Sequence, residues 1–133
     1  MTTIQARNIL AQLDSKRSFI ANTMTSKDFI SFSDPTLYKF FEGGMREGEL
    51  SEWGIQSGVG GREVLLKLLS SATQRGLWSL WVRSRSGAEV YPPAWSARGV
   101  ELAKLRFAYT DQPVADLKPL FMDSFFKLII IDE

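Results

Sequence analysis

The sequence contains neither cysteine nor histidine, and these two absences restrict the chemistry that the chain can perform. Without cysteine, the chain can form no disulfide, no cysteine-ligated zinc site and no thiol nucleophile. Without histidine, it lacks the side chain that most often serves as a general base and as a metal ligand. Catalysis by this chain would therefore depend on carboxylates, lysine, hydroxyl groups or a bound cofactor.

Long apolar runs and a strong charge imbalance are also missing from the sequence. No apolar run approaches the roughly 18 residues of a membrane-spanning helix, and the N-terminus lacks the hydrophobic core of a signal peptide. The formal net charge is +1, which does not indicate a nucleic-acid-binding protein. We therefore expect a cytoplasmic protein without membrane contact. Its 133 residues fit a single domain.

Strands and helices are expected to alternate from residue 50 onwards. Short apolar runs predict four strands, at about residues 50–56, 77–83, 105–109 and 128–132. Helices are expected at residues 62–74, 91–98 and 114–126, with Pro119 kinking the last of them. Trp78 and Trp81 are expected in the core on opposite faces of the sheet. This order predicts an α/β fold, with a parallel sheet of about four strands and helices on both faces.

A helical lead-in, residues 1–49, is expected to precede the α/β core of residues 50–133 within the same domain. Apolar residues at helical spacing predict an amphipathic helix within residues 4–20. Asp34 and Pro35 predict the start of a second, short helix, because aspartate caps helix N-termini and proline suits the first turn. The glycines at 43–44 are expected to end it.

A glycine-rich loop, residues 54–63, connects the first expected strand to the helix that follows it, where open parallel sheets bind their ligands. Gly58 and Gly60 fit a phosphate loop, whose motif ends in glycine, lysine and then serine or threonine. Here Gly61 stands at the lysine position and Arg62 at the hydroxyl position. The loop therefore lacks both the lysine that neutralises phosphates and the hydroxyl that holds Mg²⁺.

Two interpretations of this loop stay open. In the first, the glycines only turn the chain tightly into the helix; in the second, backbone amides and Arg62 bind a nucleotide or another anion weakly. Glu63 adds negative charge that opposes a triphosphate. Asp132 ends the last expected strand, where a metal-orienting acid would lie, but without the lysine and hydroxyl a polar strand exit is the simpler interpretation. We expect no cofactor, ATP with Mg²⁺ included.

A basic and aromatic cluster is expected near the ligand-binding edge of the sheet: Arg83, Arg85, Tyr91, Trp95 and Arg98. Such a mixture is typical of protein interfaces, in which Trp, Tyr and Arg are enriched. It also suits a surface that stacks and clamps single-stranded nucleic acid. A third interpretation is that Trp95 packs its helix onto the sheet while the arginines are solvated.

The sequence on both sides of the glycine loop resembles the RecA family. Residues 43–53 (GGMREGELSEW) are similar to the segment that leads into that family's phosphate loop. Residues 98–105 (RGVELAKL) resemble the glycine-led stretch before its third strand, and residues 128–132 resemble the strand ending in the Walker B aspartate. The resemblance is greatest to the ImuA/SulA branch, in the segments GREVLLKLL, LWSLWV and YPPAWSARGVELAKLRF.

This resemblance implies a role in the bacterial DNA-damage (SOS) response. We expect a non-catalytic, ImuA-like accessory factor of mutagenic translesion repair that binds a protein partner, such as the polymerase-like ImuB or RecA, or self-associates. The alternatives are a SulA-like inhibitor of cell division that binds FtsZ, and a weak ATPase that uses Arg62 and Asp132.

The sequence also departs from the RecA pattern. Residues 83–87 (RSRSG) offer no counterpart of the catalytic glutamate, and the sequence ends at the fourth expected strand. We therefore expect a sheet truncated after the Walker B-type strand. Because the DNA-binding loops of RecA have no equivalent here, tight DNA binding is not expected.

Overall fold

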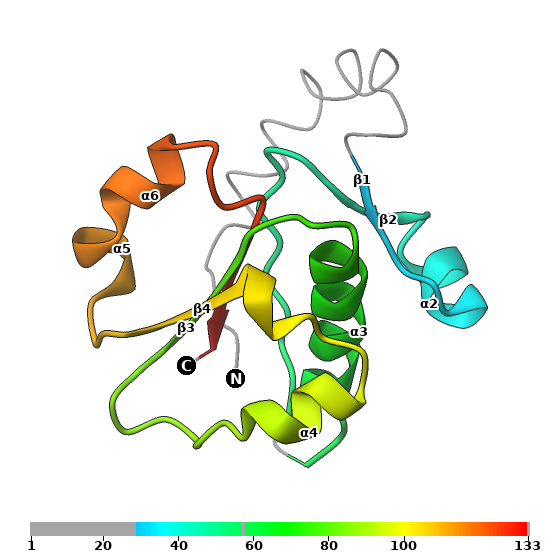
Figure 1. Ribbon diagram of the computed structural model, residues 1–133, viewed down its shortest axis with the longest axis horizontal. Helices are drawn as coiled ribbons and strands as arrows, with labels where there is room; N and C mark the ends of the chain where they lie inside the picture. The colour runs from blue at the N-terminus through cyan, green and yellow to red at the C-terminus, as the bar shows by residue number, and fades with distance from the viewer. Residues whose placement is uncertain (1–28, 57, 133) are drawn as a thin grey trace.

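A three-stranded parallel sheet forms the centre of the structure (Figure 1). In the computed structural model, which describes residues 29–56 and 58–132, the strand order is β4-β3-β5. The strands are β3 (Ser79–Arg83), β4 (Leu105–Tyr109) and β5 (Leu128–Asp132). All of β3 is buried, as a central strand with both edges paired requires. The parallel pairing of these three strands confirms the α/β class.

Helices flank this sheet on two sides. α3 (Gly61–Gln74) and α4 (Pro92–Ala97) lie on one side, and α5 (Pro113–Asp116) and α6 (Lys118–Met122) lie on the other (Figure 1). Right-handed crossovers explain why the helices lie on both sides. The chain moves from β3 to β4 in one direction across the sheet and from β4 past β3 to β5 in the opposite direction, so the two connections cover opposite faces. The single kinked helix expected at residues 114–126 is two short helices, with Pro119 in the first turn of α6.

The first expected strand is absent from the described structure: residues 50–56 form no ladder, so the sheet has three parallel strands rather than four. Residues 48–51 and Trp53 run beside β5 but line a hollow that separates them from it. Trp53 instead stacks on Phe41, with ring centroids 4.9 Å apart. This contact holds the segment toward α2 (Pro35–Phe40) and away from the edge of β5 that pairs with no other described strand.

An antiparallel pair that the sequence did not predict precedes the sheet. It consists of β1 (Phe29–Ser31) and β2 (Gly44–Arg46), on either side of α2. Asp34 caps α2 as expected, because its Oδ1 accepts hydrogen bonds from Thr36 N at 2.9 Å and Leu37 N at 3.1 Å. The helix expected within residues 4–20 lies outside the described residues.

One hydrophobic core joins these parts. Ile30 and Phe32 pack in the same cluster as α3 and the sheet, so residues 29–49 share the core of the α/β unit. At its centre, the fully buried Trp81 contacts Trp95 of α4, with ring centroids 4.7 Å apart. A 3₁₀ helix, Leu102–Lys104, leads into β4. Within residues 29–56 and 58–132, no helix combines the length and apolar character needed to cross a bilayer.

Candidate functional site

The three parallel strands end together at the edge of the sheet where such folds bind ligands. Their last residues are Arg83, Tyr109 and Asp132, and Arg83 is the ladder partner of the other two. Residues paired across a parallel ladder project to the same face of the sheet. We call this row of three residues the carboxyl edge. α3 begins beside it, at the end of the glycine-rich loop.

Arg62 and Asp132 form an ion pair at the carboxyl edge. Arg62 Nη2 donates a hydrogen bond to Asp132 Oδ2 at 2.6 Å, and the Asp132 side chain is only 10% exposed. The Arg62 guanidinium also lies 5.9 Å from the ring centroid of Trp81. The cation at the hydroxyl position of the motif therefore neutralises the acid at the Walker B-type position. Arg62 and Asp132, two of the five residues proposed for nucleotide binding, are thus brought together, but as partners in an ion pair.

The glycine loop is closed by its own side chains. A Cβ added at Gly61 would lie 2.1 Å from Ile55 Cγ2, so Ile55 fills the space beside the lysine position of the motif. Gly58 and Gly60 have φ of +83° and +84°, in the left-handed region that favours glycine, and no atom lies within 4 Å of a Cβ built on either. These two glycines are explained by the tight turn into α3.

A second ion pair lies beside the start of α3. Arg98 Nε donates to Glu63 Oε2 at 2.9 Å, and Arg98 Nη1 donates to Ala94 O at 3.3 Å. Both charged side chains are about half exposed. The pair links the first turn of α3 to the end of α4. Arg98 is therefore engaged with Glu63 and lies apart from the network of Arg83.

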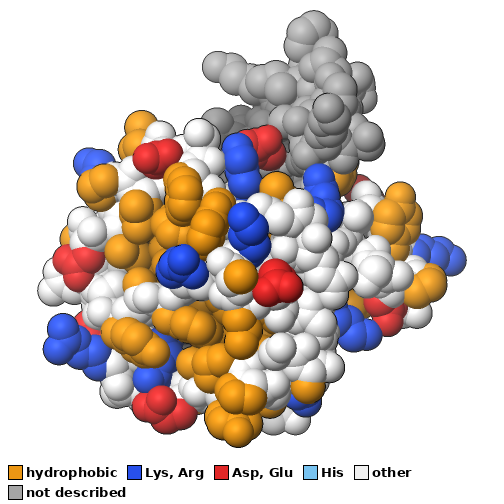
Figure 2. Space-filling model, in the orientation of Figure 1, with side chains coloured by type: hydrophobic (Ala, Val, Ile, Leu, Met, Phe, Trp, Pro, Cys, Tyr) orange, Lys and Arg blue, Asp and Glu red, His pale blue; other side chains and the backbone are white. Residues whose placement is uncertain are grey.

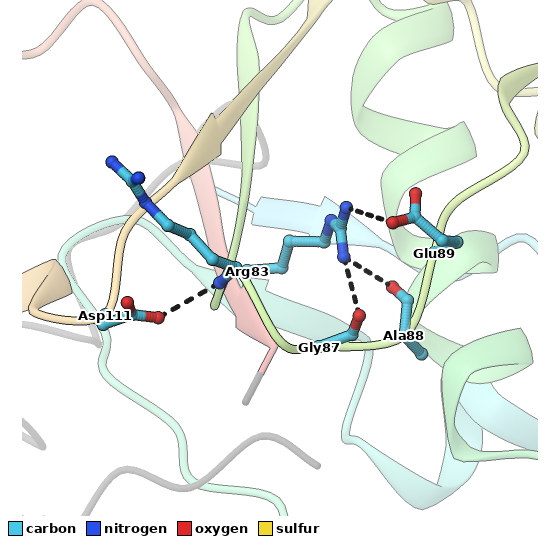
Figure 3. A network of polar contacts seen from close by, with 6 residues as sticks. Arg83, Gly87, Ala88, Glu89 and Asp111 are labelled. Atoms are coloured by element: carbon cyan, nitrogen blue, oxygen red, sulfur yellow. Dashed lines mark hydrogen bonds and ion pairs between the residues drawn. The ribbon is translucent and has the colours of Figure 1, made fainter.

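Arg83 points into the structure and organises the loop that follows β3 (Figure 3). Its Nη1 donates to Gly87 O at 2.7 Å and Ala88 O at 3.3 Å, and its Nη2 donates to Glu89 Oε1 at 3.0 Å. The guanidinium also lies 4.7 Å from the ring centroid of Tyr109. With 7% of its side chain exposed, Arg83 is a structural residue of the loop rather than a surface cation.

A polar hollow opens beside this loop, at the ends of β3 and β4. Its lining residues are Arg85, Tyr109, Thr110, Asp111, Gln112 and Asp116. Asp111 Oδ1 accepts a hydrogen bond from Arg85 N at 3.1 Å, and Thr110 Oγ1 donates to Asp116 Oδ2. Figure 3 places Asp111 on the opposite side of Arg83 from Glu89. Asp111 thus connects the loop after β3 to the loop after β4, and Asp116 binds Thr110 within the latter.

The five residues proposed to bind a partner do not form one exposed cluster. Trp95 is 5% exposed and packs between Trp81 and Phe107, so its ring belongs to the core. Tyr91 is 69% exposed, and Arg85 is exposed at the polar hollow. The interpretation that Trp95 packs α4 onto the sheet fits this placement. Trp95 and the buried Arg83 are therefore withdrawn as partner-binding surface.

The chemistry available at this edge is limited. Within residues 29–56 and 58–132, no group of three or more acidic side chains is placed to hold a metal ion. Comparisons with protein-family models, with curated proteins and with solved structures found no match to this chain.

Two features of functional interest were not predicted from the sequence. Ile55 was an ordinary apolar residue in a glycine loop, and only its packing on Gly61 shows that it closes the motif. The second is a cluster of Trp78, Lys104, Arg106 and Phe125 on the other side of the sheet. The alternation of Lys104 and Arg106 around Leu105 was the one local signal of a basic strand surface.

Proposed function

We propose that this chain is a RecA-like protein that does not hydrolyse ATP and acts by binding another protein, as an ImuA-like accessory factor of the DNA-damage response. The observation that carries the proposal is the Arg62–Asp132 ion pair at the carboxyl edge. A phosphate loop uses the equivalent positions for a metal-binding hydroxyl and a metal-orienting acid. In this chain, Arg62 and Asp132 occupy these positions and form an ion pair with each other.

A nucleotide and its metal ion would have to break this pair before they could bind. Removing Arg62 from the buried carboxylate of Asp132 would break a hydrogen-bonded ion pair, which is costly at a buried carboxylate. Ile55 would also have to leave Gly61 before phosphate oxygens could reach the first turn of α3. Glu63 lies in that turn, and its negative charge opposes phosphate, although Arg98 forms an ion pair with it. These three features support a role without ATP turnover.

Exposed apolar side chains support the part of the proposal that concerns a protein partner. Ten large apolar side chains of the described part are exposed, among them Tyr91, Val114 and Met122. Contiguous exposed apolar surface is a feature of protein interaction sites. The assignment to the DNA-damage response rests on the sequence resemblance, and the α/β sheet is consistent with it.

Isothermal titration of the full chain with ATP, in the presence and absence of Mg²⁺, tests the first half of the proposal. We expect no saturable heat of binding at millimolar ATP and no release of phosphate above background. Circular dichroism of the same sample confirms that the protein is folded. Micromolar ATP affinity that depends on Mg²⁺ would overturn the proposal in favour of a weak ATPase.

Co-purification and sedimentation with candidate partners test the second half. We expect a stable complex with a polymerase-like ImuB protein or with RecA, and no effect on FtsZ polymerisation. Inhibition of FtsZ assembly by the purified chain would instead indicate the SulA-like function. Tight binding to single-stranded DNA at physiological salt, without any protein complex, would contradict a role through protein contacts.

A further inference from the structure

The segment that connects β4 to β5 contributes no helix residue to the core. Neither α5 nor α6 contains a buried residue, although both have apolar side chains. Phe121 is 40% exposed, Met122 is 83% exposed and Phe125, which follows α6, is 51% exposed. Exposed apolar side chains that lie together on a surface are typical of sites that another molecule covers. The exposed side chains therefore indicate a surface that another molecule covers.

Trp78 lies at the base of this segment and gathers two cations. Its ring stacks on Phe125, with centroids 5.2 Å apart and an interplanar angle of 25°. Lys104 Nζ lies 4.7 Å from the Trp78 centroid, and the Arg106 guanidinium lies 4.6 Å from it. Cation–π contact holds both positive charges beside the apolar surface. Lys104 ends the 3₁₀ helix before β4 and Arg106 is the second residue of β4, so the two cations lie on either side of Leu105 in the sequence.

Neither cation is neutralised by an acid in the part of the chain that the structure describes. The ion pairs among these residues involve Arg62, Lys67, Arg83, Arg98 and Lys127 as cations. Arg106 Nη1 donates only to a backbone oxygen, that of Leu105, at 2.9 Å. The positive charge of Lys104 and Arg106 is thus available to an acidic group from outside.

We call these six residues the Trp78 surface: Trp78, Lys104, Arg106, Phe121, Met122 and Phe125. Figure 2 shows hydrophobic side chains gathered over α6 and beside the start of β4, with basic side chains next to them. The surface lies on the side of the sheet opposite α3 (Figure 1). It is therefore separate from the ion pairs that close the carboxyl edge.

We propose that the Trp78 surface docks an acidic segment of another protein whose apolar side chains cover Phe121, Met122 and Phe125. This inference rests on the proposed function and names the partner chemistry. Acidic groups would pair with Lys104 and Arg106, while the apolar groups remove the exposed rings from water. Aromatic residues and arginine are the types that most often dominate binding energy in protein interfaces.

The charges of the Trp78 surface favour an acidic protein segment over a second copy of this chain and over a nucleic-acid strand. A second copy related by a twofold axis would neutralise Lys104 and Arg106 only by bringing acidic side chains to them, and none of the six residues of the Trp78 surface is acidic. A nucleic-acid strand would need a row of cations that follows its phosphates. The surface offers only two cations, both on the ring of Trp78, which is too few for such a row.

Fluorescence anisotropy with labelled synthetic peptides tests the proposal on the full chain. The first peptide alternates Glu with Leu and Phe, the second replaces every Glu by Lys, and the third replaces every Leu and Phe by Ser. We expect the first peptide to bind and the other two to bind at least about tenfold more weakly, at roughly 150 mM salt. Equal binding of the first and second peptides would overturn the proposal.

Substitutions locate the binding. Arg106→Glu and Phe125→Ser should each weaken binding of the first peptide by about tenfold or more. Lys39→Glu and Phe40→Ser, which change the same residue kinds at exposed positions of α2, are the matched controls and should leave the affinity unchanged. Thermal unfolding of each variant checks that it folds. Unchanged affinity in both Trp78-surface variants would contradict the proposal.

Two further arms decide between occupants. If Arg106→Glu abolishes binding of an oligothymidylate of about 20 nucleotides, while the first peptide does not bind, the surface is a nucleic-acid site and the proposal is wrong. Concentration-dependent sedimentation that Phe125→Ser removes would assign the surface to a second copy and overturn it as well. Neither outcome depends on the titration with ATP, so failure here is distinguishable from failure of the proposed function.

Discussion

Ile55 occupies the space in which a phosphate loop would need a lysine side chain. Gly61 lies at the first position of α3, and its lack of a side chain is required by close packing. The neighbouring Arg62 is held by Asp132 at 2.6 Å. The loop therefore lacks the lysine and the hydroxyl of a phosphate loop, and Ile55 also fills the space in which that lysine side chain would begin. Restoring the motif residues alone would not restore the site.

The variant Gly61→Lys with Arg62→Thr should bind ATP with Mg²⁺ no better than the unmodified chain. The new lysine Cβ would meet Ile55 Cγ2 at 2.1 Å, so the side chain of Ile55, the loop or the helix must shift. Adding Ile55→Ala removes the obstructing Cγ2, and the triple variant should bind more tightly than the double variant. Isothermal titration measures both affinities. Equal affinity of the two variants would show that Ile55 does not close the loop.

Asp34 links the cap of α2 to α3 and makes stability depend on pH. The hydrogen bond from Lys67 Nζ, at 2.8 Å, is the largest cause that holds the pKa of Asp34 below its ordinary value of 3.8. Because the folded pKa is the lower one, Asp34 stabilises the fold above pH 3.8, and this contribution is lost as pH falls through the folded pKa. The free-energy difference between the unmodified chain and Asp34→Asn should therefore be larger at pH 7 than at about pH 2.5.

Urea unfolding of both proteins at the two pH values measures this difference. Lys67→Met removes the donor and serves as a second variant, in which the pH dependence due to Asp34 should be smaller. A difference between the unmodified chain and Asp34→Asn that does not change with pH would show that the carboxylate charge contributes nothing to stability.

The antiparallel pair β1–β2 depends on one glycine. Gly44 has φ of +147°, and a Cβ there would lie 2.1 Å from Ile30 O in the backbone of β1. Gly44→Ala should therefore destabilise the protein by on the order of 3 kcal/mol. Gly76→Ala is the matched control, because Gly76 also has positive φ, +78°, but has no atom within 4 Å of the built Cβ. Its cost should stay near 1–2 kcal/mol, roughly that of left-handed backbone for a residue with a side chain.

Chemical denaturation gives both values on a common scale. If Gly76→Ala costs as much as Gly44→Ala, backbone conformation rather than the contact with β1 determines the effect. The account of the pair β1–β2 would then be wrong.

The elements that sequence patterns predicted are those whose signal is local. The strands expected at 77–83, 105–109 and 128–132 are confirmed by β3, β4 and β5, and the unbroken apolar run of residues 128–131 was the clearest of their local signals; α3 was predicted from its apolar stripe. Residues 50–56 were predicted as a strand from the same kind of local reasoning, but whether they pair with β5 depends on a distant contact, that of Trp53 with Phe41. The strands β1 and β2 have three residues each, too few for a periodic pattern.

The site was predicted less well than the fold, for the same physical reason. The absence of lysine and hydroxyl in the loop could be read directly from the sequence, whereas the pairing of Arg62 with Asp132 joins residues 70 positions apart. The burial of Trp95 depends on Trp81 and Phe107 of two different strands. The Trp78 surface is likewise assembled from separate segments, so sequence reasoning placed Trp78 simply in the core.

At the scale of the whole molecule, the two sides of the sheet differ in how the cations beside them are paired. On the side of α3, the core is closed and Arg62 and Arg98 each pair with an acid. On the side of α5 and α6, apolar side chains are exposed, and Lys104 and Arg106 form no ion pair within the described residues. This asymmetry is the basis for locating function away from the glycine loop.

The central claim is that the carboxyl edge is closed by the chain's own side chains and takes no nucleotide. A ¹⁵N-resolved NMR titration with ATP and Mg²⁺ tests it residue by residue, because the amides of Gly58, Gly60 and Gly61 report directly on the loop. The account predicts that these three signals keep their positions, apart from small shifts that do not saturate. Saturating, Mg²⁺-dependent shifts of the loop glycines would contradict it.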